Sequence, residues 1–368
     1  MPMSEPAVVI WRSAMLSGSE TFIRNQADSL TRWRPAYLGA TKVESDIARA
    51  GDVIAYPSEA DRRAFLRLRL TGQSPQLLRL LAAQRAKLVH AHFGGDGWLI
   101  SGSAQRLGIP LVVTVHGHDV TRQPATPGAK GMRYRRNLRA MFQRAAAVIA
   151  VSEVIREKAI RWGADPAKVR VHYTGVPIPS STPEASKEWD VVFVGRFVEK
   201  KGADDLVAAL STMDRPVRAL FIGDGPLLPQ VRASAAALRV DATFRGSLPP
   251  DEVYRLLGAS RILAAPSRTA ADGDTEGLPT TIVEAAALGL PVVSTRHSGI
   301  PEAVTDGETG LLGAEGDRPA LAAGLTRLLA DEPLRERFGK QAREQAMARF
   351  DVRKQSRGLE DLYDEVTA

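Results

Sequence analysis

The feature that most restricts the fold of this chain is a series of short apolar runs separated by stretches with helical periodicity. Four runs occupy residues 7–11, 87–93, 110–117 and 146–152, and four more occupy residues 190–197, 218–225, 261–267 and 291–295. Runs rich in Val and Ile, without polar alternation, are typical of parallel strands buried on both faces. The sequence therefore predicts an α/β protein with two parallel sheets.

The two series of runs are separated by residues 174–189, which are rich in Pro, Ser and charged residues, as a linker is. The length of 368 residues also exceeds that of a typical single core. We predict an N-terminal Rossmann-like domain at residues 1–177 and a C-terminal one at residues 178–350. A C-terminal helix at residues 351–368 is expected to pack back toward the N-terminal domain.

Charge is distributed unevenly along the chain. Residues 1–180 contain 26 Lys and Arg against 13 Asp and Glu, whereas residues 181–368 contain 23 against 29. A basic half suits nucleic acid, an anionic membrane or a phosphorylated substrate. Zinc-finger spacings and RNP-type aromatic patterns do not occur, so we expect no nucleic-acid partner. The absence of cysteine, of an apolar run of about 20 residues and of a secretory signal pattern indicates a cytoplasmic protein.

The most specific motif lies in the segment DGDTEGLPTTIVEAAALGLPVVST at residues 272–295, where Glu276 and Glu284 stand eight positions apart. Gly277 permits close approach of a ligand, and Pro279 suits the first turn of a helix whose free N–H groups attract phosphate. The segment resembles the Glu-x7-Glu signature of the family 4 retaining glycosyltransferases. In that resemblance Glu276 contacts the donor sugar and Glu284 the ribose.

A second motif, VGRFVEKKG at residues 194–202, follows a predicted strand and resembles the diphosphate clamp of the same family. Arg196 and Lys201 would neutralise the leaving nucleoside diphosphate without a metal. The neighbouring Lys200 is expected to be a solvated basic residue. In FIGDGP, Gly223 suits either contact with the nucleotide or a plain tight turn.

Polar residues also end the predicted strands of the first half, in HAHFG (His90 and His92) and VHGHDV. His116 resembles the family histidine that contacts the donor sugar, and His118 and Asp119 belong to the same stretch. A role for these histidines in the sheet rim remains an alternative. Zinc is not expected, because no cysteine or Glu-x-x-His pattern accompanies them.

The stretch SGSETFIRNQ follows the first predicted strand and departs from Gly-x-Gly-x-x-Gly, which disfavours a dinucleotide-binding site. It resembles the Ser-Glu-Thr-Phe opening of polysaccharide-assembly members of the family. Gly18 would then approach the donor phosphate, and Glu20 would face the acceptor. A simple helix cap at Ser19 is the alternative.

The resemblance covers both halves and implies a GT-B fold of two facing Rossmann-like domains with an interdomain cleft. It implies retaining transfer of a hexosyl unit from a UDP- or GDP-sugar, without a cofactor, in bacterial surface polysaccharide synthesis. The rivals are a nucleotide-sugar 2-epimerase and a non-catalytic nucleotide-sugar binder. The implied catalytic residues are His116, Arg196, Lys201 and Glu276, and the donor-binding residues are Gly18, Gly223, Gly277, Leu278, Pro279 and Glu284.

The acceptor is expected to be a lipid-linked oligosaccharide or a growing saccharide. Residues 62–85 carry six arginines among leucines, a pattern that suits the anionic inner face of the cytoplasmic membrane or, alternatively, a solvated helix with a buried leucine stripe. Residues 121–131 are expected to lack regular structure. The acceptor-binding candidates are Glu20, His118, Asp119, Arg133, Arg135 and Arg136.

Overall fold

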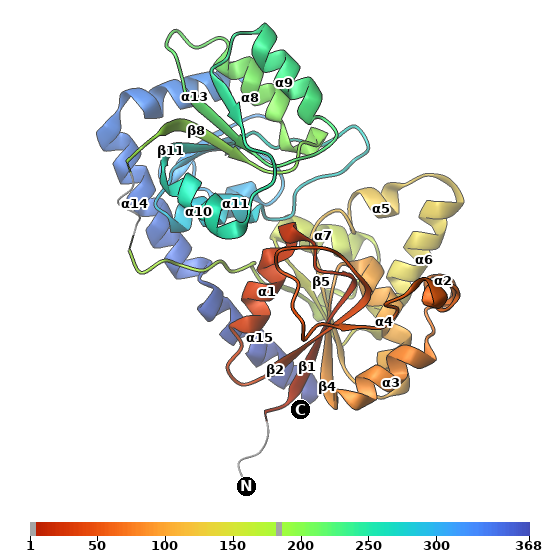
Figure 1. The fold of residues 1–368 in the computed structure, drawn as a ribbon. Helices are drawn as coiled ribbons and strands as arrows, with labels where there is room; N and C mark the ends of the chain where they lie inside the picture. Colours follow the sequence, from red (N-terminus) through yellow and green to blue (C-terminus); the bar gives the residue numbers. More distant parts are fainter. Residues whose placement is uncertain (1–4, 182–185) are drawn as a thin grey trace. The chain divides into compact units, whose positions relative to one another are not determined.

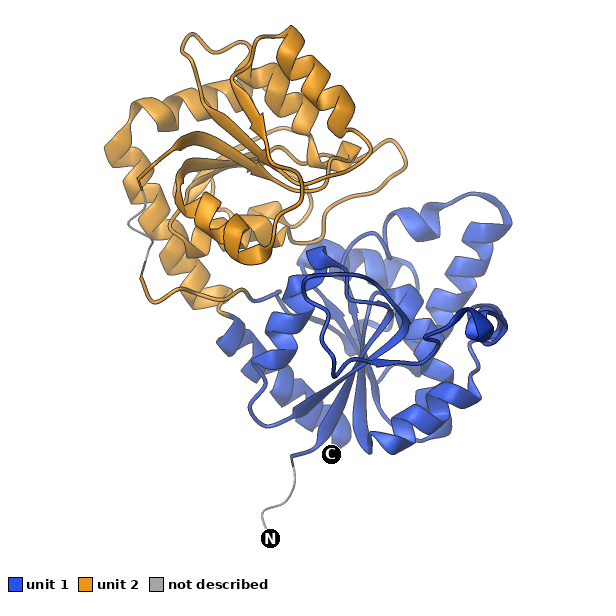
Figure 2. Cartoon of the chain, viewed as in Figure 1, with its two compact units in different colours: residues 1–175, 352–368 blue, residues 176–351 orange. Residues whose placement is uncertain are grey.

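The computed structural model describes residues 5–181 and 186–368, which form two compact units (Figures 1 and 2). Unit 1 comprises Met1–Gly175 and Val352–Ala368, and unit 2 comprises Val176–Asp351. The last helix of the chain therefore belongs to unit 1. Of the expected linker at residues 174–189, residues 182–185 lie outside the described residues.

Unit 1 contains a parallel sheet with the strand order β3-β2-β1-β4-β5-β6-β7. Its strands are β1 (Ala7–Met15), β2 (Arg34–Lys42), β3 (Val53–Ile54), β4 (Ala86–His92), β5 (Leu111–Val115), β6 (Ala147–Ala150) and β7 (Val169–Val171). Its helices are α1 (Thr21–Asp28), α2 (Arg62–Thr71), α3 (Pro75–Ala83), α4 (Gly94–Arg106), α5 (Arg122–Ala125), α6 (Gly128–Arg144), α7 (Glu153–Arg161) and α15 (Val352–Thr367). Short 3-10 turns occupy Gly18–Glu20, Glu59–Asp61 and Pro166–Lys168.

Unit 2 contains a second parallel sheet with the order β10-β9-β8-β11-β12-β13. Its strands are β8 (Trp189–Val194), β9 (Ala219–Ile222), β10 (Ala242–Phe244), β11 (Ser260–Ala265), β12 (Val292–Thr295) and β13 (Gly310–Gly313). Its helices are α8 (Ala203–Leu210), α9 (Leu228–Ala237), α10 (Pro250–Gly258), α11 (Thr280–Ala287), α12 (Ile300–Ala303), α13 (Arg318–Ala330) and α14 (Glu332–Arg349), and a 3-10 turn occupies Glu199–Lys201.

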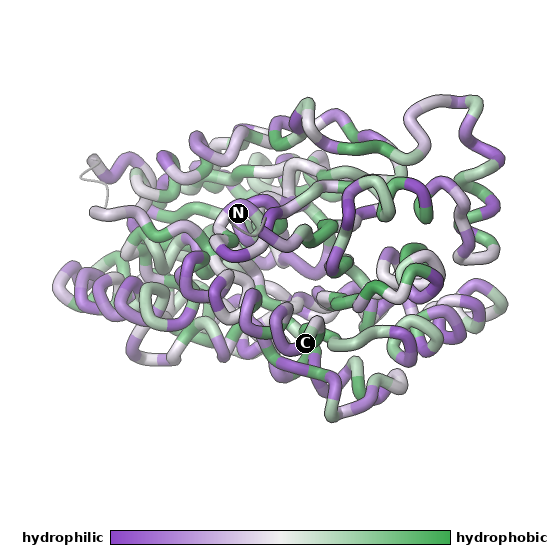
Figure 3. Tube along the Cα trace, turned by 90° about the horizontal axis from the view of Figure 1, so that it is seen from below, coloured by the Kyte–Doolittle hydropathy of each residue, from purple (hydrophilic) through white to green (hydrophobic). Residues whose placement is uncertain are grey.

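The predicted α/β fold with two parallel sheets is confirmed. The Val- and Ile-rich strands are buried on both faces, whereas hydrophilic and hydrophobic residues alternate along the helices (Figure 3). In each sheet the strand order reverses once, between β1 and β4 in unit 1 and between β8 and β11 in unit 2. Open parallel sheets bind ligands at the carboxyl ends of the strands beside such a reversal. The loops after these four strands are therefore where a site is expected.

The expectation that residues 121–131 lack regular structure is wrong, because they contain α5 and the start of α6. Pro127 stands just before the first residue of α6, where a missing N–H costs nothing. Gly131 is required by packing, since a Cβ there would lie 1.6 Å from the carbonyl oxygen of Thr126. These residues shape a helix start and a close contact, so the Pro and Gly content does not indicate a loop.

Helix α15 is anchored to the rest of unit 1 by buried polar groups. The Glu360 carboxylate is fully buried and accepts hydrogen bonds from the backbone N–H groups of Thr31 and Arg32, both at 2.6 Å. The Tyr363 hydroxyl, also buried, lies 2.6 Å from His90 Nδ1. The end of the chain is thus part of the core of unit 1.

We predict that Glu360→Ala lowers the free energy of unfolding by about 3 kcal/mol, because it leaves buried N–H groups without an acceptor. Glu365→Ala, on the same helix, removes an exposed carboxylate that pairs with Arg170 at 3.5 Å, and should cost less than about 0.5 kcal/mol. Urea denaturation followed by circular dichroism measures both variants. Equal losses would contradict the anchoring role.

Candidate functional site

In unit 2 the loop after β8 carries both members of the predicted diphosphate clamp. Phe197 is buried and packs against Phe193 with ring centroids 5.5 Å apart, which fixes the loop to the core. Arg196 is exposed beside it. Lys201 Nζ lies 3.1 Å from Glu276 Oε1. The structure therefore joins two candidates that come from separate sequence motifs.

Glu276 follows β11 and is buried, with 7% of its surface exposed. Burial alone would raise the pKa of its carboxyl, but the nearby charges of Lys201 and Lys200 outweigh burial and hold this pKa below its usual value. Glu276 is therefore an ionised carboxylate in the interior of unit 2.

Lys200 is buried, so the expectation of a solvated residue is wrong. Its Nζ donates hydrogen bonds to Asp274 Oδ1 and to the carbonyl oxygen of Thr275, both at 3.2 Å. The two adjacent lysines thus point to the same segment, Lys200 toward residues 274–275 and Lys201 toward Glu276. Together they hold the loop that carries the glutamate.

Glu284 lies in α11, is 9% exposed and has no ion-pair partner among the described residues. Burial raises the pKa of Glu284 to about 7, and Lys201 offsets only part of this rise. Burial, together with the negative charge of Glu284, raises the pKa of the nearby Tyr254 hydroxyl. The pKa values of the two glutamates are therefore shifted in opposite directions, so that Glu276 is ionised and Glu284 titrates near neutrality.

The remaining donor candidates of unit 2 lie around these glutamates. Gly277, Leu278 and Pro279 are buried, and α11 begins one residue after Pro279. Gly223 has a φ of +130°, and a Cβ there would lie 2.0 Å from the carbonyl oxygen of Gly195. The chain itself therefore requires a glycine at position 223, and its contact with a donor stays a prediction.

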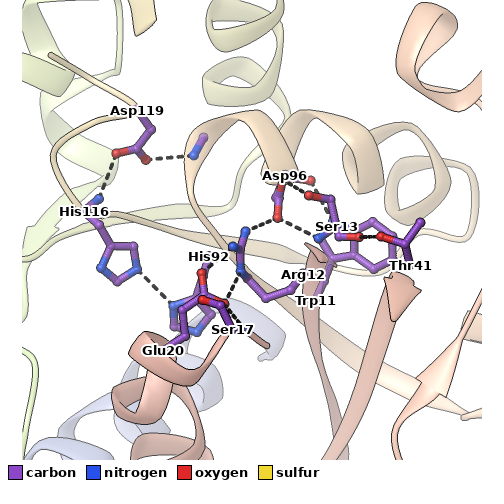
Figure 4. A network of polar contacts seen from close by, with 11 residues as sticks. Trp11, Arg12, Ser13, Ser17, Glu20, Thr41, His92, Asp96, His116 and Asp119 are labelled. Atoms are coloured by element: carbon purple, nitrogen blue, oxygen red, sulfur yellow. Dashed lines mark hydrogen bonds and ion pairs between the residues drawn. The ribbon is translucent and has the colours of Figure 1, made fainter. Parts of the chain in front are cut away.

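In unit 1 the loop after β1 is organised by Arg12, a residue that sequence analysis missed (Figure 4). Its guanidinium pairs with Glu20 Oε1 at 2.5 Å, also pairs with Asp96, and lies over the Phe93 ring, 4.4 Å from its centroid. Glu20 also accepts a hydrogen bond from the N–H of Ser17 at 3.2 Å. The carboxylate predicted to face an acceptor is thus held by a partly buried cation.

Asp96, in the first turn of α4, ties that helix to β1. Its two carboxylate oxygens accept hydrogen bonds from the N–H and the hydroxyl of Ser13, both at 2.7 Å. Gly18, in the same region, is exposed, and a Cβ there would lie 3.9 Å from the hydroxyl oxygen of Ser45, an ordinary contact. One sequence signal could have indicated this network, namely a charged Arg12 inside the apolar run AVVIWRS.

Three histidines form a row at the carboxyl end of β4 and β5. The rings of His90 and His92 stack with centroids 4.5 Å apart, and His92 Nδ1 lies 3.1 Å from His116 Nε2. Burial lowers the pKa of His90 and of His116 to about 3, and the charge of Arg12 adds to the effect at His116. All three imidazoles, including His92, whose pKa burial also lowers, are therefore neutral near pH 7. Within the described residues, no group of three or more His, Asp or Glu side chains is arranged to hold a metal.

Asp119 is buried and bridges two loops. It accepts hydrogen bonds from the backbone N–H groups of Gly94 at 2.8 Å and of His116 and Gly117 at 3.0 Å. Burial raises the pKa of Asp119, although these N–H groups oppose the rise. His118 Nε2 accepts from the side-chain amide of Gln123 at 2.9 Å. Contact of Asp119 or His118 with an acceptor stays a prediction.

The three predicted acceptor arginines of α6 differ in their surroundings. Arg135 donates to the carbonyl oxygen of Pro124 at 2.8 Å and so supports α5. Arg133 donates to the carbonyl oxygen of Arg69, which joins α6 to α2. Arg136 is exposed. Arg135 therefore has a structural contact, whereas Arg136 offers a free surface charge.

The raised pKa of Glu284 predicts how the stability of the protein changes with pH. Its pKa is about 7 in the folded chain against an ordinary value of 4.5, so its contribution favours folding below about pH 4.5 and is lost as the pH rises through 7. Glu284→Gln should therefore stabilise the protein relative to wild type at about pH 8. Its effect on the free energy of unfolding should be more favourable at pH 8 than at pH 4.5, by on the order of 3 kcal/mol.

The matched variant Glu276→Gln should destabilise the protein at about pH 8, because it leaves Lys201 without its buried partner. Urea unfolding at several pH values measures both. A stability difference for Glu284→Gln that does not change with pH would contradict the raised pKa.

Comparisons with known proteins are consistent with these features. The family model described as Glycosyltransferase Family 4 matches residues 16–178, and that described as Glycosyl transferases group 1 matches residues 177–345. The amylovoran biosynthesis glycosyltransferase AmsK of Erwinia amylovora is 30% identical over 282 residues, which cover 72% of this chain and 68% of AmsK. The D-inositol 3-phosphate glycosyltransferase of Corynebacterium efficiens is 32% identical over 317 residues, covering 76% and 71%.

Solved structures share the fold. Sucrose-phosphate synthase from Thermosynechococcus elongatus superposes with a TM-score of 0.81 at 19% identity, covering 98% of this chain and 99% of that one. HepE of Anabaena, in complex with UDP-glucose, superposes with a TM-score of 0.79 at 20% identity and the same coverage. Both likenesses concern the GT-B fold. Sequence and fold together show that the chain belongs to glycosyltransferase family 4 and is a glycosyltransferase enzyme.

Proposed function

We propose that this glycosyltransferase moves a hexosyl unit, with retention of configuration, from a UDP- or GDP-sugar to a lipid-linked or growing saccharide in bacterial exopolysaccharide synthesis. The observation that carries the proposal is the ion pair between Lys201 and the buried Glu276, which places a cation and an ionised carboxylate together beside the strand-order reversal of unit 2. The name of AmsK and the UDP-glucose bound to HepE support the pathway and the donor class.

The residues of unit 2 have distinct proposed roles. Arg196 and Lys201 stabilise the negative charge that grows on the leaving diphosphate, which is electrostatic catalysis by preorganised groups. Glu276 accepts hydrogen bonds from sugar hydroxyls, and Glu284 from the ribose. A phosphate oxygen of the leaving group takes the proton of the acceptor hydroxyl. Neutral His116, in unit 1, offers a hydrogen bond to the sugar.

The reaction is proposed to need no metal or other cofactor. A nucleoside diphosphate leaves as an anion, and either a divalent cation or fixed cationic side chains can neutralise it. The exposed Arg196 and the adjacent Lys201 supply two such charges from one loop.

We propose further that the α2–α6 surface of unit 1 rests on an anionic membrane. Acidic residues are absent from residues 62–95 and 120–152, which contain both helices and seven Lys or Arg residues each. Three large apolar side chains on these helices are more than half exposed: Leu66, Leu70 and Met132. Basic charge interleaved with exposed apolar side chains suits the headgroup region of an anionic bilayer. No helix among the described residues is long and apolar enough to span a membrane.

We predict that Arg196→Ala and Lys201→Ala each lower kcat/KM for the donor by about 100-fold or more. Arg255→Ala is the control, because this exposed arginine of α10 lies outside the proposed site. The assay is sugar transfer or donor hydrolysis from a panel of UDP- and GDP-sugars. Unchanged kcat/KM in both variants would refute the donor site.

The same assay in excess EDTA tests the metal-free reaction. Activity should persist, because Arg196 and Lys201 replace a divalent cation at the diphosphate. Complete loss that added Mn²⁺ restores would overturn this part of the proposal.

For the membrane surface we predict that Arg136→Ser combined with Arg139→Ser, two exposed arginines of α6, weakens binding to vesicles of phosphatidylglycerol and phosphatidylcholine by about 10-fold or more, since about 1 kcal/mol is expected per charge. Arg133 is left intact because it joins α6 to α2. Arg135 is left intact because it supports α5. The control removes two exposed charges elsewhere on unit 1, Arg161 and Arg357. Vesicle sedimentation measures binding, and donor affinity should stay unchanged. Equal vesicle binding by both double variants would contradict the proposed surface.

A further inference from the structure

We infer that His297 is a positioning residue that holds the backbone of Glu276 for contact with the donor sugar, a role that rests on the proposed donor site. His297 follows β12 and is 1% exposed. Its Nε2 accepts a hydrogen bond from the N–H of Glu276 at 3.0 Å. The imidazole thus binds the main chain of Glu276, whose carboxylate pairs with Lys201.

The hydrogen bonds of His297 define its tautomer. Nε2 can accept from the Glu276 N–H only if it carries no proton. The proton of the neutral ring then sits on Nδ1, which lies 2.6 Å from Glu315 Oε1 and donates to it. Glu315 therefore selects the tautomer that Glu276 needs.

Glu315 is itself fixed on the other side. It accepts a hydrogen bond from the N–H of Thr269 at 2.7 Å. Burial would raise the pKa of Glu315, but the bonds from Thr269 and His297 lower it, so the acceptor is ionised. The line Thr269–Glu315–His297–Glu276 connects the start of the loop after β11 to its functional end.

The two residues after His297 also form hydrogen bonds to the main chain of Glu276 and Gly277. The Ser298 hydroxyl donates to the carbonyl oxygen of Glu276 at 2.6 Å, and the N–H of Gly299 donates to that of Gly277 at 3.2 Å. Ser298 has a φ of +48°, a left-handed conformation that costs free energy for a residue other than glycine. Segment 297–299 thus bonds both the N–H and the carbonyl group of Glu276.

Glu276 is therefore held at two points, its main chain by His297 and its carboxylate by Lys201. Without His297 the Lys201 contact remains, but the backbone that sets the direction of the carboxylate is free to shift. A shift of this kind affects contacts to the sugar, whereas the diphosphate is assigned to Arg196 and Lys201. Loss of the His297 contact should therefore weaken the affinity for a nucleotide sugar but leave the affinity for the free nucleotide unchanged.

Two polar substitutions test the two ring nitrogens separately. His297→Gln places an amide oxygen near the position of Nε2 and keeps an acceptor for the Glu276 N–H, but loses the donor to Glu315. His297→Asn keeps an N–H near the position of Nδ1 for Glu315 but loses the acceptor for Glu276. Both side chains are polar and smaller than imidazole, and Gln is one methylene longer than Asn.

The probes are UDP, GDP, UDP-glucose and GDP-mannose, with Kd measured by calorimetry and KM and kcat by transfer or hydrolysis. For His297→Asn we expect the KM and Kd of the accepted nucleotide sugar to rise about tenfold, since a buried N–H loses its acceptor. Its Kd for the free nucleoside diphosphate should stay within about twofold. His297→Gln should remain near wild type for both ligands. Melting temperatures of both variants establish that they fold.

Equal loss of nucleotide-sugar affinity in the two variants, or equal loss for the nucleotide and the nucleotide sugar, would overturn the positioning role and indicate general loosening of the loop. Wild-type affinity in His297→Asn would also overturn it while leaving the proposed function intact. Wild-type protein that binds none of the four probes would refute the proposed function, and this inference with it. The two failures are therefore distinguishable.

Discussion

The burial of the Glu276 carboxylate is the constraint around which unit 2 arranges its loops. An ionised carboxylate in the interior costs several kcal/mol unless cations and hydrogen bonds compensate it. Lys201 supplies the ion pair at 3.1 Å, Lys200 adds a second charge, and the main chain is secured by His297. Four loops, after β8, β11, β12 and β13, are thereby fixed relative to one another. Their arrangement before a ligand arrives is what preorganised electrostatic catalysis requires.

In unit 1, buried carboxylates are compensated mainly by hydrogen bonds from backbone groups. Asp119 is satisfied by three main-chain N–H groups, and Asp96 by Ser13 and Arg12. These buried carboxylates join the loops after β1, β4 and β5, with Arg12 as the cationic partner of Asp96. Because Arg12 is the cation of this network and the histidines are neutral, the edge of the sheet is less cationic than the basic surface formed by α2 and α6. The charge excess of the first half of the sequence thus lies mainly on helices.

The sequence predicted the parts that depend on local pattern. The eight apolar runs are strands because Val and Ile side chains need burial on both faces, whereas β3, β7, β10 and β13, with two to four residues each, are too short to show a pattern. Strand β2 is nine residues long but was also missed, because its sequence RPAYLGATK contains Pro and Gly and no run of Val or Ile. The Glu-x7-Glu segment also stands out locally. By contrast, nothing local distinguishes buried Lys200 from Lys201, since adjacent residues point in different directions. His297 was missed because its role depends on contacts 18 and 21 residues away, which only the folded sheet creates.

The two glutamates of the motif show why residue type alone does not determine chemistry. Glu276 is ionised because a lysine touches it, whereas Glu284, equally buried, has a pKa of about 7 because the charge of Lys201 offsets only part of the effect of burial. A carboxyl that the fold leaves uncompensated weakens the free protein, and such instability is common where a ligand later supplies the missing partners. Ribose hydroxyls are donors of the required kind. The proposed contact with the ribose would supply the partners that Glu284 lacks, whereas Lys201 and His297 hold Glu276 within the fold itself.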